Sequence, residues 1–351
     1  MPKFKSEELL KFAERLLSSA GVAEDDARLT AKMLIQADLN GYAGHGIAHI
    51  PSYINRIKAG VMRLDERPKV IREGKTTALM DGKFYIGQVA AHEGMKLAIE
   101  KAREHGVGTV CLFHAGHVGR LADHVELAAD QGMIGVAMVG VGGNSVASYG
   151  TMEPVGGTNP MAFGVPGKNR RHIIFDFATA ALSSGELRQK AEKSEAIPEG
   201  MMLDGRGHPT TDFKTFLGPP KGVVLPFGGY KGSGLHLMVE ILGGILAGNG
   251  LGREWWDRGG PAINAAFLQA IDIEEFQPLN EFLEKVDELV RFVKSRKAAP
   301  GFGEVLLPGD RSRARVSKHL KEGIELKAKA WTELTRCASE LGVEAPTPIQ
   351  Q

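Results

Sequence analysis

The sequence has few cysteines and no excess of charge of either sign. Its only two cysteines, Cys111 and Cys337, lie far apart, which excludes a disulfide framework and a zinc site built from thiolates. Lys and Arg number 43 against 42 Asp and Glu, and the net charge of +1 produces no overall field that would attract nucleic acid or an acidic membrane surface. We therefore expect a small-molecule ligand, and neither nucleic acid nor membrane as a partner.

Long apolar runs are absent as well. The N-terminal segment MPKFKSEELLKFAERLL lacks the apolar core of a signal peptide, and no window approaches the roughly 18 apolar residues of a membrane span. We therefore expect a cytoplasmic protein, which suits its unpaired cysteines. Glycine, by contrast, is abundant at 45 of 351 residues and clusters at 140–157, 228–234 and 243–252, where it would let backbone approach a ligand closely.

The first sixty residues have helical periodicity. In the third helical stretch, isoleucines at 47, 50, 54 and 57 form an apolar face. The opposite side carries His45, His49, Ser52 and Arg56, which would form one polar stripe if the helix were continuous. Pro51 interrupts this pattern, so it either lies in the first turn of a later helix or kinks an earlier one.

From about residue 76 the pattern alternates between strands and helices, which predicts an α/β domain. A β-α-β unit is expected from a strand at 107–113, a helix at 117–131 and a strand at 133–140. Further predicted elements are helices at 88–105, 232–247, 280–296 and 311–340, strands at 172–177 and 264–272, and an ordered loop at 196–229.

Two glycine-rich stretches are candidates for nucleotide binding. GVGGNS at 140–145 follows a strand, but its third glycine is replaced by Ser145 and no helix opens after it, so it is not a Rossmann fingerprint. PFGGYKGSGLHLMVEIL at 226–242 runs directly into a helix, whose free N–H groups and dipole would favour a phosphate beside Lys231. The alternative is that these glycines only permit close helix packing.

The segment CLFHAGHVGR places two histidines at the end of a strand. His114 and His117, or His45 and His49, could bind a metal, but no thiolate or H-E-x-x-H motif accompanies either pair. They could also be hydrogen-bonded interior histidines. His117 lies in a loop that follows a strand and opens a helix, where α/β sheets place ligand-facing residues, so we favour it as an acid-base group.

A carboxylate inside an apolar strand is the remaining candidate. Asp176 lies in FDFATA, and a buried carboxylate is unfavourable unless it is bound. Either backbone N–H groups satisfy it or it faces a polar ligand, and the residues alone leave both alternatives open.

Together these segments resemble the malate/L-lactate dehydrogenase family of the non-Rossmann type, whose members include ureidoglycolate, sulfolactate and diketogulonate dehydrogenases. The similar blocks, in order over nearly the whole chain, are DLNGYAGHGIAHIPSYINR, HAGHVGR, MEPVGGTNPMAFGVP, FDFATA, IPEGMMLDGRGHPTTD, LPFGGYKGSGLHLMVEIL and APGFGEVLLPGD. The resemblance implies an α/β (α+β) fold with a mixed-sheet nucleotide domain, a helical domain formed by both chain ends, and a homodimer. The expected boundaries are 1–75 and 299–351 for the helical parts and 76–298 for the NAD(P)-binding catalytic domain.

The resemblance also implies residue roles. His117 matches the family's proton acceptor, and Thr158 and Asn159 would lie beside the nicotinamide. The other residues that match its NAD(P) contacts are Val141, Asp176, Phe177, Ala178, Tyr230 and Lys231. We expect NAD as the cofactor, with NADP as the alternative, and no metal.

One motif departs from the family pattern. The family's S-H-G-x-x-R holds the substrate carboxylate with its Ser and Arg, whereas this chain has Gly44, His45, Gly46 and His49. An imidazole lacks the planar fork with which a guanidinium binds a carboxylate. Arg120 is a candidate replacement, and a substrate other than a simple 2-hydroxy acid is the second explanation.

The sequence thus predicts an NAD(P)-dependent oxidoreductase for a small 2-hydroxy or 2-oxo acid. His117 would exchange the hydroxyl proton, and His45 and His49 would orient the substrate. Two alternatives remain: a metal-dependent hydrolase that uses the histidine pairs, and a non-catalytic NAD(P)-binding relative.

Overall fold

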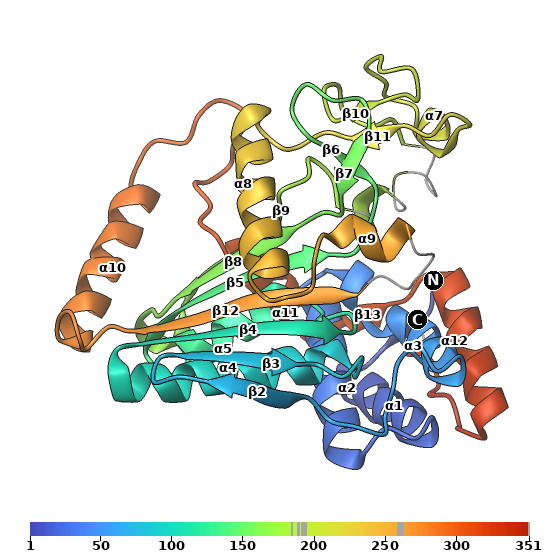
Figure 1. Ribbon diagram of the computed structural model, residues 1–351, viewed down its shortest axis with the longest axis horizontal. Helices are drawn as coiled ribbons and strands as arrows, with labels where there is room; N and C mark the ends of the chain where they lie inside the picture. The colour runs from blue at the N-terminus through green and yellow to red at the C-terminus, as the bar shows by residue number, and fades with distance from the viewer. Residues whose placement is uncertain (184, 188–189, 191–194, 258–262, 350–351) are drawn as a thin grey trace.

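The computed structural model describes residues 1–183, 185–187, 190, 195–257 and 263–349. A seven-stranded mixed sheet crosses the molecule in the order β2-β3-β4-β12-β5-β8-β9 (Figure 1). The bounds are β2 Lys69–Glu73, β3 Thr77–Asp81, β4 Val107–Ala115, β12 Asn264–Asp272, β5 Met133–Val141, β8 Pro160–Val165 and β9 Ile173–Ala178. Strands β3 and β4 pair in parallel, and the other neighbours pair antiparallel. The predicted mixed-sheet α/β fold is therefore confirmed.

Helices cover both faces of this sheet. Helices α4 (Gly87–His105) and α5 (Leu121–Ala129) pack on one face, and α8 (Tyr230–Glu240) with the π-helical turn Ile241–Ile245 packs on the other (Figure 1). A Cβ added to Gly140 of β5 would lie 3.1 Å from the Cα of Gly244. Glycine in the GVGG stretch thus brings backbone onto backbone, and no helix follows it in the structure, as the sequence predicted.

The predicted β-α-β unit exists as β4-α5-β5, with one strand inserted. Strand β12, from much later in the chain, lies antiparallel between β4 and β5, and its Asn264 pairs with both Ala115 and Val141. Helix α5 begins at Leu121 rather than at 117, because the left-handed φ of +81° at Gly119 keeps the preceding loop out of the helix. The carboxyl ends of β4 and β5 therefore share one edge of the sheet.

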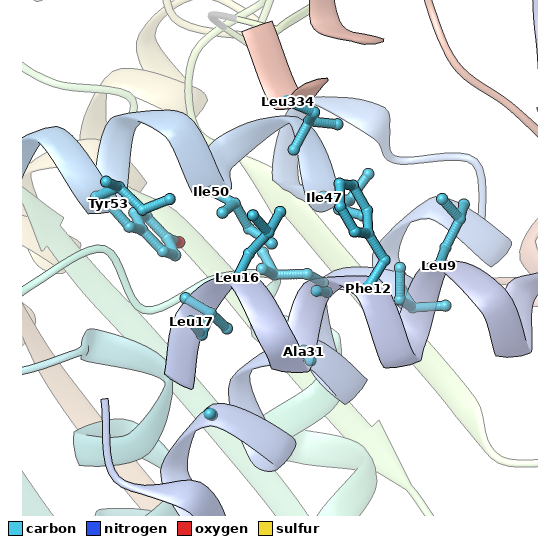
Figure 2. Close-up of a cluster of buried hydrophobic side chains, with 14 of the residues drawn as sticks. Leu9, Phe12, Leu16, Leu17, Ala31, Ile47, Ile50, Tyr53 and Leu334 are labelled. Atoms are coloured by element: carbon cyan, nitrogen blue, oxygen red, sulfur yellow. The ribbon is translucent and has the colours of Figure 1, made fainter. Parts of the chain in front are cut away.

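Both chain ends surround one apolar core. The core includes Leu9, Phe12, Ile47, Ile50 and Leu334, which face one another in Figure 2. The elements are α1 Ser6–Ser19, α2 Glu24–Leu39, α3 Ile50–Lys58, α11 Asp310–Glu322 and α12 Ala328–Leu341, with β1 Lys3–Phe4 paired to β13 Ile324–Glu325. The packing of amino- and carboxyl-terminal helices fits the expected helical domain, whose exact boundaries stay predictions.

The single helix expected at 311–340 was wrong. Gly323 takes a left-handed φ of +86°, and the next two residues pair as β13 with β1, so α11 ends before α12 begins. A left-handed residue cannot continue a right-handed helix, and glycine adopts it without steric penalty.

A small four-stranded sheet completes the fold. Its order is β10-β11-β6-β7, and the predicted ordered loop at 196–229 supplies β10 and β11. The remaining elements are β6 Val146–Ala147, β7 Pro154–Gly156, β10 Met202–Leu203, β11 Val223–Val224, α7 Phe213–Leu217, α9 Gly252–Asp257, α10 Leu279–Lys294 and the 3-10 turns Ala43–His45, Ile47–His49 and Lys168–Arg170. No helix in the described part of the chain has the length and apolar character needed to cross a lipid bilayer.

Candidate active site

His117 lies two residues beyond the end of β4, in the loop that opens α5. Its Nδ1 is 2.7 Å from the hydroxyl of Tyr53 on α3. Desolvation, followed by the nearby His49 and His45, holds the pKa of His117 well below its usual range. The imidazole is therefore neutral at physiological pH, the form that can accept a proton.

Two further histidines from the amino-terminal region stand beside His117. The ring of His49 stacks on that of His117 with centroids 4.7 Å apart, and the ring of His45 lies 5.5 Å away. Burial lowers the pKa of His45 to about 4. The structure thus brings together all three histidines that the sequence singled out for proton transfer and substrate orientation.

Of the two alternatives for Pro51, the structure confirms the first, a place in the first turn of a later helix, so the histidines do not form one continuous helical stripe. His45 and His49 end two separate 3-10 turns, and α3 begins only at Ile50, with Pro51 in its first turn. The break is at Gly46, where an added Cβ would lie 1.9 Å from Oδ1 of Asp38.

Asp38 anchors the turn that carries these histidines. It is 4% exposed, and its Oδ2 accepts a hydrogen bond from the Ile47 N–H at 2.7 Å. Desolvation raises the pKa of this carboxyl to about 7, although the hydrogen bond opposes the shift. The buried carboxyl and the glycine beside it explain why the chain turns here instead of continuing as a helix.

Arg120, the candidate for holding a substrate carboxylate, is already paired. Its guanidinium is 6% exposed, binds Asp123 and lies 5.8 Å from the ring of Tyr42. A second arginine stands close to the histidines: Arg56 follows Tyr53 by one turn of α3, and its charge contributes to lowering the pKa of His117. The sequence placed Arg56 in the polar stripe without assigning it a role.

His114 contacts other residues than His117 does. Its Nδ1 lies 3.4 Å from Asp81, and its ring stacks on Phe84 at 4.6 Å, so the interior alternative describes it well. Within the described residues, no three His, Cys, Asp or Glu side chains are placed to share a metal ion. The hydrolase alternative therefore lacks a ligand set in this part of the chain.

The predicted cofactor residues lie along the same sheet edge. Asn159 precedes β8, and its Oδ1 accepts the N–H of Val141 at the end of β5, at 3.1 Å. The Asn159 side chain is fully buried, and its Nδ2 donates to Glu240 at 2.7 Å. Any contact of Asn159 with a cofactor would therefore come through its backbone, which the side chain holds in place.

Glu240 organises a buried network that no pattern in the sequence predicts. Its second oxygen, Oε1, accepts the N–H of Gly252 at 2.6 Å. Next to it, His236 Nδ1 lies 3.1 Å from the hydroxyl of Thr179, which in turn donates to the backbone oxygen of Asn159 at 2.9 Å. Helix α8 is thereby tied to the loops before β8 and before α9.

The glycine-rich loop lies beside the end of β9. Backbone hydrogen bonds run from Phe227 N to Thr179 O and from Thr179 N to Thr158 O, which places the start of α8 next to Thr158 and Ala178. The glycines of this loop differ in their surroundings, and phosphate binding beside them stays a prediction. Gly228 and Gly229 take left-handed φ values of +58° and +65° before the exposed Tyr230 and Lys231, whereas the next glycine packs against Phe227.

Asp176 is bound by backbone, as the first of the two alternatives left open for it predicted, and its contact with a cofactor stays a prediction. Its Oδ2 accepts the N–H of Ala122 in the first turn of α5 at 2.9 Å. Burial raises its pKa to about 6, against the opposing effect of that hydrogen bond and of Arg120. The next residue, Phe177, has its ring 5.6 Å from that of Phe227 at the glycine-rich loop.

One edge of the large sheet brings His117 near the residues that the sequence predicted to bind the cofactor. His117 follows β4 and Val141 ends β5, and β12 alone separates these strands. Two inter-strand spacings give about 10 Å between the strand ends. Asn264 of β12 links the two sides, because its side chain accepts the N–H of Val118, next to His117, at 3.1 Å. His117 and Val141 therefore lie on neighbouring parts of one sheet edge, with Asn264 between them.

The comparisons with known proteins agree with this geometry. The family model described as malate/L-lactate dehydrogenase matches residues 4–335. The malate/(S)-sulfolactate dehydrogenase of Methanothermus fervidus is 39% identical over 94% of this chain and 95% of its own length. Among solved structures, malate dehydrogenase from Entamoeba histolytica superposes with a TM-score of 0.93 at 30% identity, covering 98% of this chain and 99% of that one. Sulfolactate dehydrogenase from Methanocaldococcus jannaschii has a TM-score of 0.89 at 34% identity, with 98% of each chain covered. The chain therefore belongs to the malate/L-lactate dehydrogenase family of hydroxy-acid dehydrogenases.

Proposed function

We propose that this enzyme is an NAD(P)-dependent dehydrogenase that interconverts a small 2-hydroxy acid and the corresponding 2-oxo acid. The observation that carries the proposal is the placement of a neutral, partly buried His117 at the same sheet edge as Val141 and Asn159. A bound nicotinamide would accept or supply the hydride. The proposal requires the substrate to lie between His117 and the loop before β8.

In this proposal His117 takes the hydroxyl proton during oxidation and returns it during reduction. Its lowered pKa favours the neutral base at physiological pH. His45 and His49 orient the substrate, since both rings stand within 5.5 Å of the His117 ring.

The start of α8 fits the pyrophosphate of a dinucleotide. The first N–H groups of a helix have no partner within the helix and favour an anion, and exposed Lys231 adds a positive charge. Two left-handed glycines before the helix leave its amino-terminal turn open to a ligand. We propose NAD as the cofactor, with NADP as the alternative.

The substrate carboxylate is the less constrained part of the proposal. Relatives are named for malate, sulfolactate and lactate, which are all 2-hydroxy acids. This chain has Gly44 and His49 where the family motif has Ser and Arg, so Arg56 or His45 would have to assist in binding the carboxylate. The same departure favours the second candidate, a relative that binds NAD(P) without catalysis.

A spectrophotometric screen separates these candidates. The purified protein is offered a panel of 2-hydroxy and 2-oxo acids with each cofactor, and the appearance or loss of reduced nicotinamide is followed. We expect turnover of at least one acid. Fluorescence binding of NADH without turnover of any acid would favour the non-catalytic relative, and failure to bind either cofactor would overturn the proposal.

We further propose that the protein is a cytoplasmic homodimer. Five large apolar side chains on α8 and the segment after it are exposed in the single chain: Leu237, Met238, Ile241, Ile245 and Leu246. A contiguous apolar patch of this kind commonly marks a protein interface, and a second copy of the chain is the occupant that we propose. Light scattering should give twice the mass of one chain, and Ile241→Glu should reduce it to one.

A further inference from the structure

Gln88 is joined to His117 through a single hydroxyl. Its Nε2 donates to the hydroxyl oxygen of Tyr53 at 2.7 Å, and the same oxygen lies 2.7 Å from Nδ1 of His117. Gln88 and Tyr53 are 0% and 1% exposed, so water does not compete for these hydrogen bonds. Among the described residues, these two are the hydrogen-bond partners of the Tyr53 hydroxyl.

The number of protons decides the direction of each hydrogen bond. The Tyr53 oxygen accepts the amide proton of Gln88, and its own single proton needs an acceptor. His117 Nδ1 is the acceptor in reach, so it must be unprotonated when the imidazole is neutral. A neutral imidazole carries one proton, which then resides on Nε2, on the far side of the ring from Tyr53.

We propose that Gln88 is a positioning residue that acts through Tyr53 to fix the neutral tautomer of His117 with its proton on Nε2. An Nε2–H suits the carbonyl oxygen of an oxo acid, which can only accept a hydrogen bond. Taking a proton from a hydroxyl instead requires the other tautomer, in which the Tyr53 hydroxyl turns away from Nδ1. The inference deepens the proposed function, because it states the form in which His117 meets its substrate.

Two glycines bring Gln88 to this position. A Cβ on Gly87 would lie 2.2 Å from the backbone oxygen of Gly116, and one on Gly119 would lie 3.0 Å from Cγ of Gln88. The first turn of α4 thus packs closely against the loop that carries His117. The Gln88 side chain lies against the same loop at Gly119. Close packing on both sides restricts the rotamers of the amide.

The side-chain amide of Gln88 contains one polar atom that lacks a hydrogen-bond partner among the described residues. Oε1 of Gln88 is buried without a hydrogen-bond partner among the described residues. An orphaned buried acceptor is unfavourable, because it has lost its hydrogen bonds to water without gaining one in the protein. Gln88 therefore donates to Tyr53 while its own acceptor has no partner among the described residues.

Heteronuclear NMR of protein labelled at its histidine nitrogens tests the proposal without any substrate. The signals of His117 among the 11 histidines are identified by their loss in a His117→Gln variant. In the wild type we expect a protonated Nε2 and an unprotonated Nδ1. In Gln88→Glu the carboxylate can only accept, so Tyr53 donates to it and accepts from Nδ1–H. We expect the tautomer ratio to reverse by about tenfold or more and the pKa of His117 to rise.

Two further variants separate positioning from folding. Gln88→Met removes both the donor and the orphaned acceptor, so we expect unchanged or higher thermal stability together with loss of the tautomer preference. Tyr53→Phe should abolish the preference equally, and adding Gln88→Met to it should change nothing more. Gln277→Glu, an exposed site with the same charge change, should behave as the wild type.

A protonated Nδ1 in the wild type, or the same tautomer ratio in Gln88→Glu and Gln88→Met, would overturn the inference. If the Glu variant does not fold, the comparison of Gln88→Met with Tyr53→Phe decides alone. These outcomes are independent of the proposed function, which stands or falls with cofactor-dependent turnover.

Discussion

Two buried polar clusters at one sheet edge differ in how completely they are hydrogen-bonded. Beneath the glycine-rich loop, the buried side chains of Asn159, Thr179, His236 and Glu240 all have partners. Beside His117, Gln88 leaves an acceptor unpaired, and desolvation depresses the pKa of the imidazole. A satisfied network makes a rigid support, whereas a group that exchanges protons must keep a site open for its substrate. Under the proposed function, the cluster beside His117 carries out proton transfer and the cluster around Glu240 supports the site.

Removing the reactive imidazole should have the largest effect. We expect His117→Gln to lower turnover by about 10²- to 10⁴-fold, the usual contribution of acid-base catalysis, while NADH affinity measured by fluorescence is unchanged. His105→Gln, on the far end of α4, serves as the control. Equal turnover in both variants would place the proton transfer elsewhere.

Breaking the supporting network should lower stability rather than chemistry. Glu240→Ala removes the carboxylate that accepts hydrogen bonds from Asn159 and Gly252, and at about 1–3 kcal/mol for each we expect a loss of roughly 2–6 kcal/mol in the free energy of unfolding. Denaturant titration measures it, with Glu288→Gln on exposed α10 as the control. A stable Glu240→Ala protein would show that the network does not support the site.

The buried carboxyl of Asp38 should make the stability of the folded protein depend on pH. Its pKa is about 7 in the folded state against 3.8 as a reference, so between these values the folded state holds a proton that the unfolded state has lost. Its contribution to stability is therefore present below about pH 4 and is lost as the pH rises to 7, by at most about 1.4 kcal/mol per pH unit. Asp38→Asn should gain stability relative to the wild type between pH 5 and pH 8.

Thermal unfolding of the wild type and of Asp38→Asn at pH 5 and pH 8 checks the direction of this change in stability. Asp25→Asn, on the exposed side of the same helix, should show no such slope. A larger deficit of Asp38→Asn at the higher pH would mean that the carboxylate is stabilised in the folded protein.

Restoring a guanidinium should have the smallest effect. His49→Arg introduces the residue of the family motif beside His117, and we expect KM for the acid identified by the screen to change by about tenfold. A lower KM would show that carboxylate binding is incomplete in this chain. A higher KM would show that the three histidine rings bind their own substrate better. Lys58→Arg, at the exposed end of α3, should leave KM unchanged.

Local patterns sufficed for much of the fold. Strand β12 has the predicted bounds 264–272, since its apolar run ends in polar residues on both sides. Its insertion between β4 and β5 could not be predicted, because strand pairing joins segments more than a hundred residues apart and leaves no local signal. The break at Gly46 was missed because it depends on the buried Asp38.

The candidate site, like the fold, could be predicted from the sequence only in part. His117 was identifiable because it follows a strand and opens a helix, a position readable from periodicity. Its hydrogen-bond partners could not be identified, because they are distant in the sequence. Tyr53 lies 64 residues from His117, and Gln88 lies 35 residues from Tyr53. Glu240 lies in an apolar helix whose partners appear only after the loops pack on it. Residue type and place in an element can be read from the sequence, whereas hydrogen-bond partners across elements need the tertiary structure.

The most direct test of the central claim follows the hydrogen at C2 of the acid that the screen identifies. The acid is prepared with deuterium at C2 and oxidised by the enzyme, and the reduced cofactor is isolated and analysed by mass spectrometry and NMR. Our account predicts one deuterium at C4 of the nicotinamide for each molecule of acid oxidised. Reduced cofactor that carries only protium, or deuterium released to water, would contradict direct hydride transfer at this site.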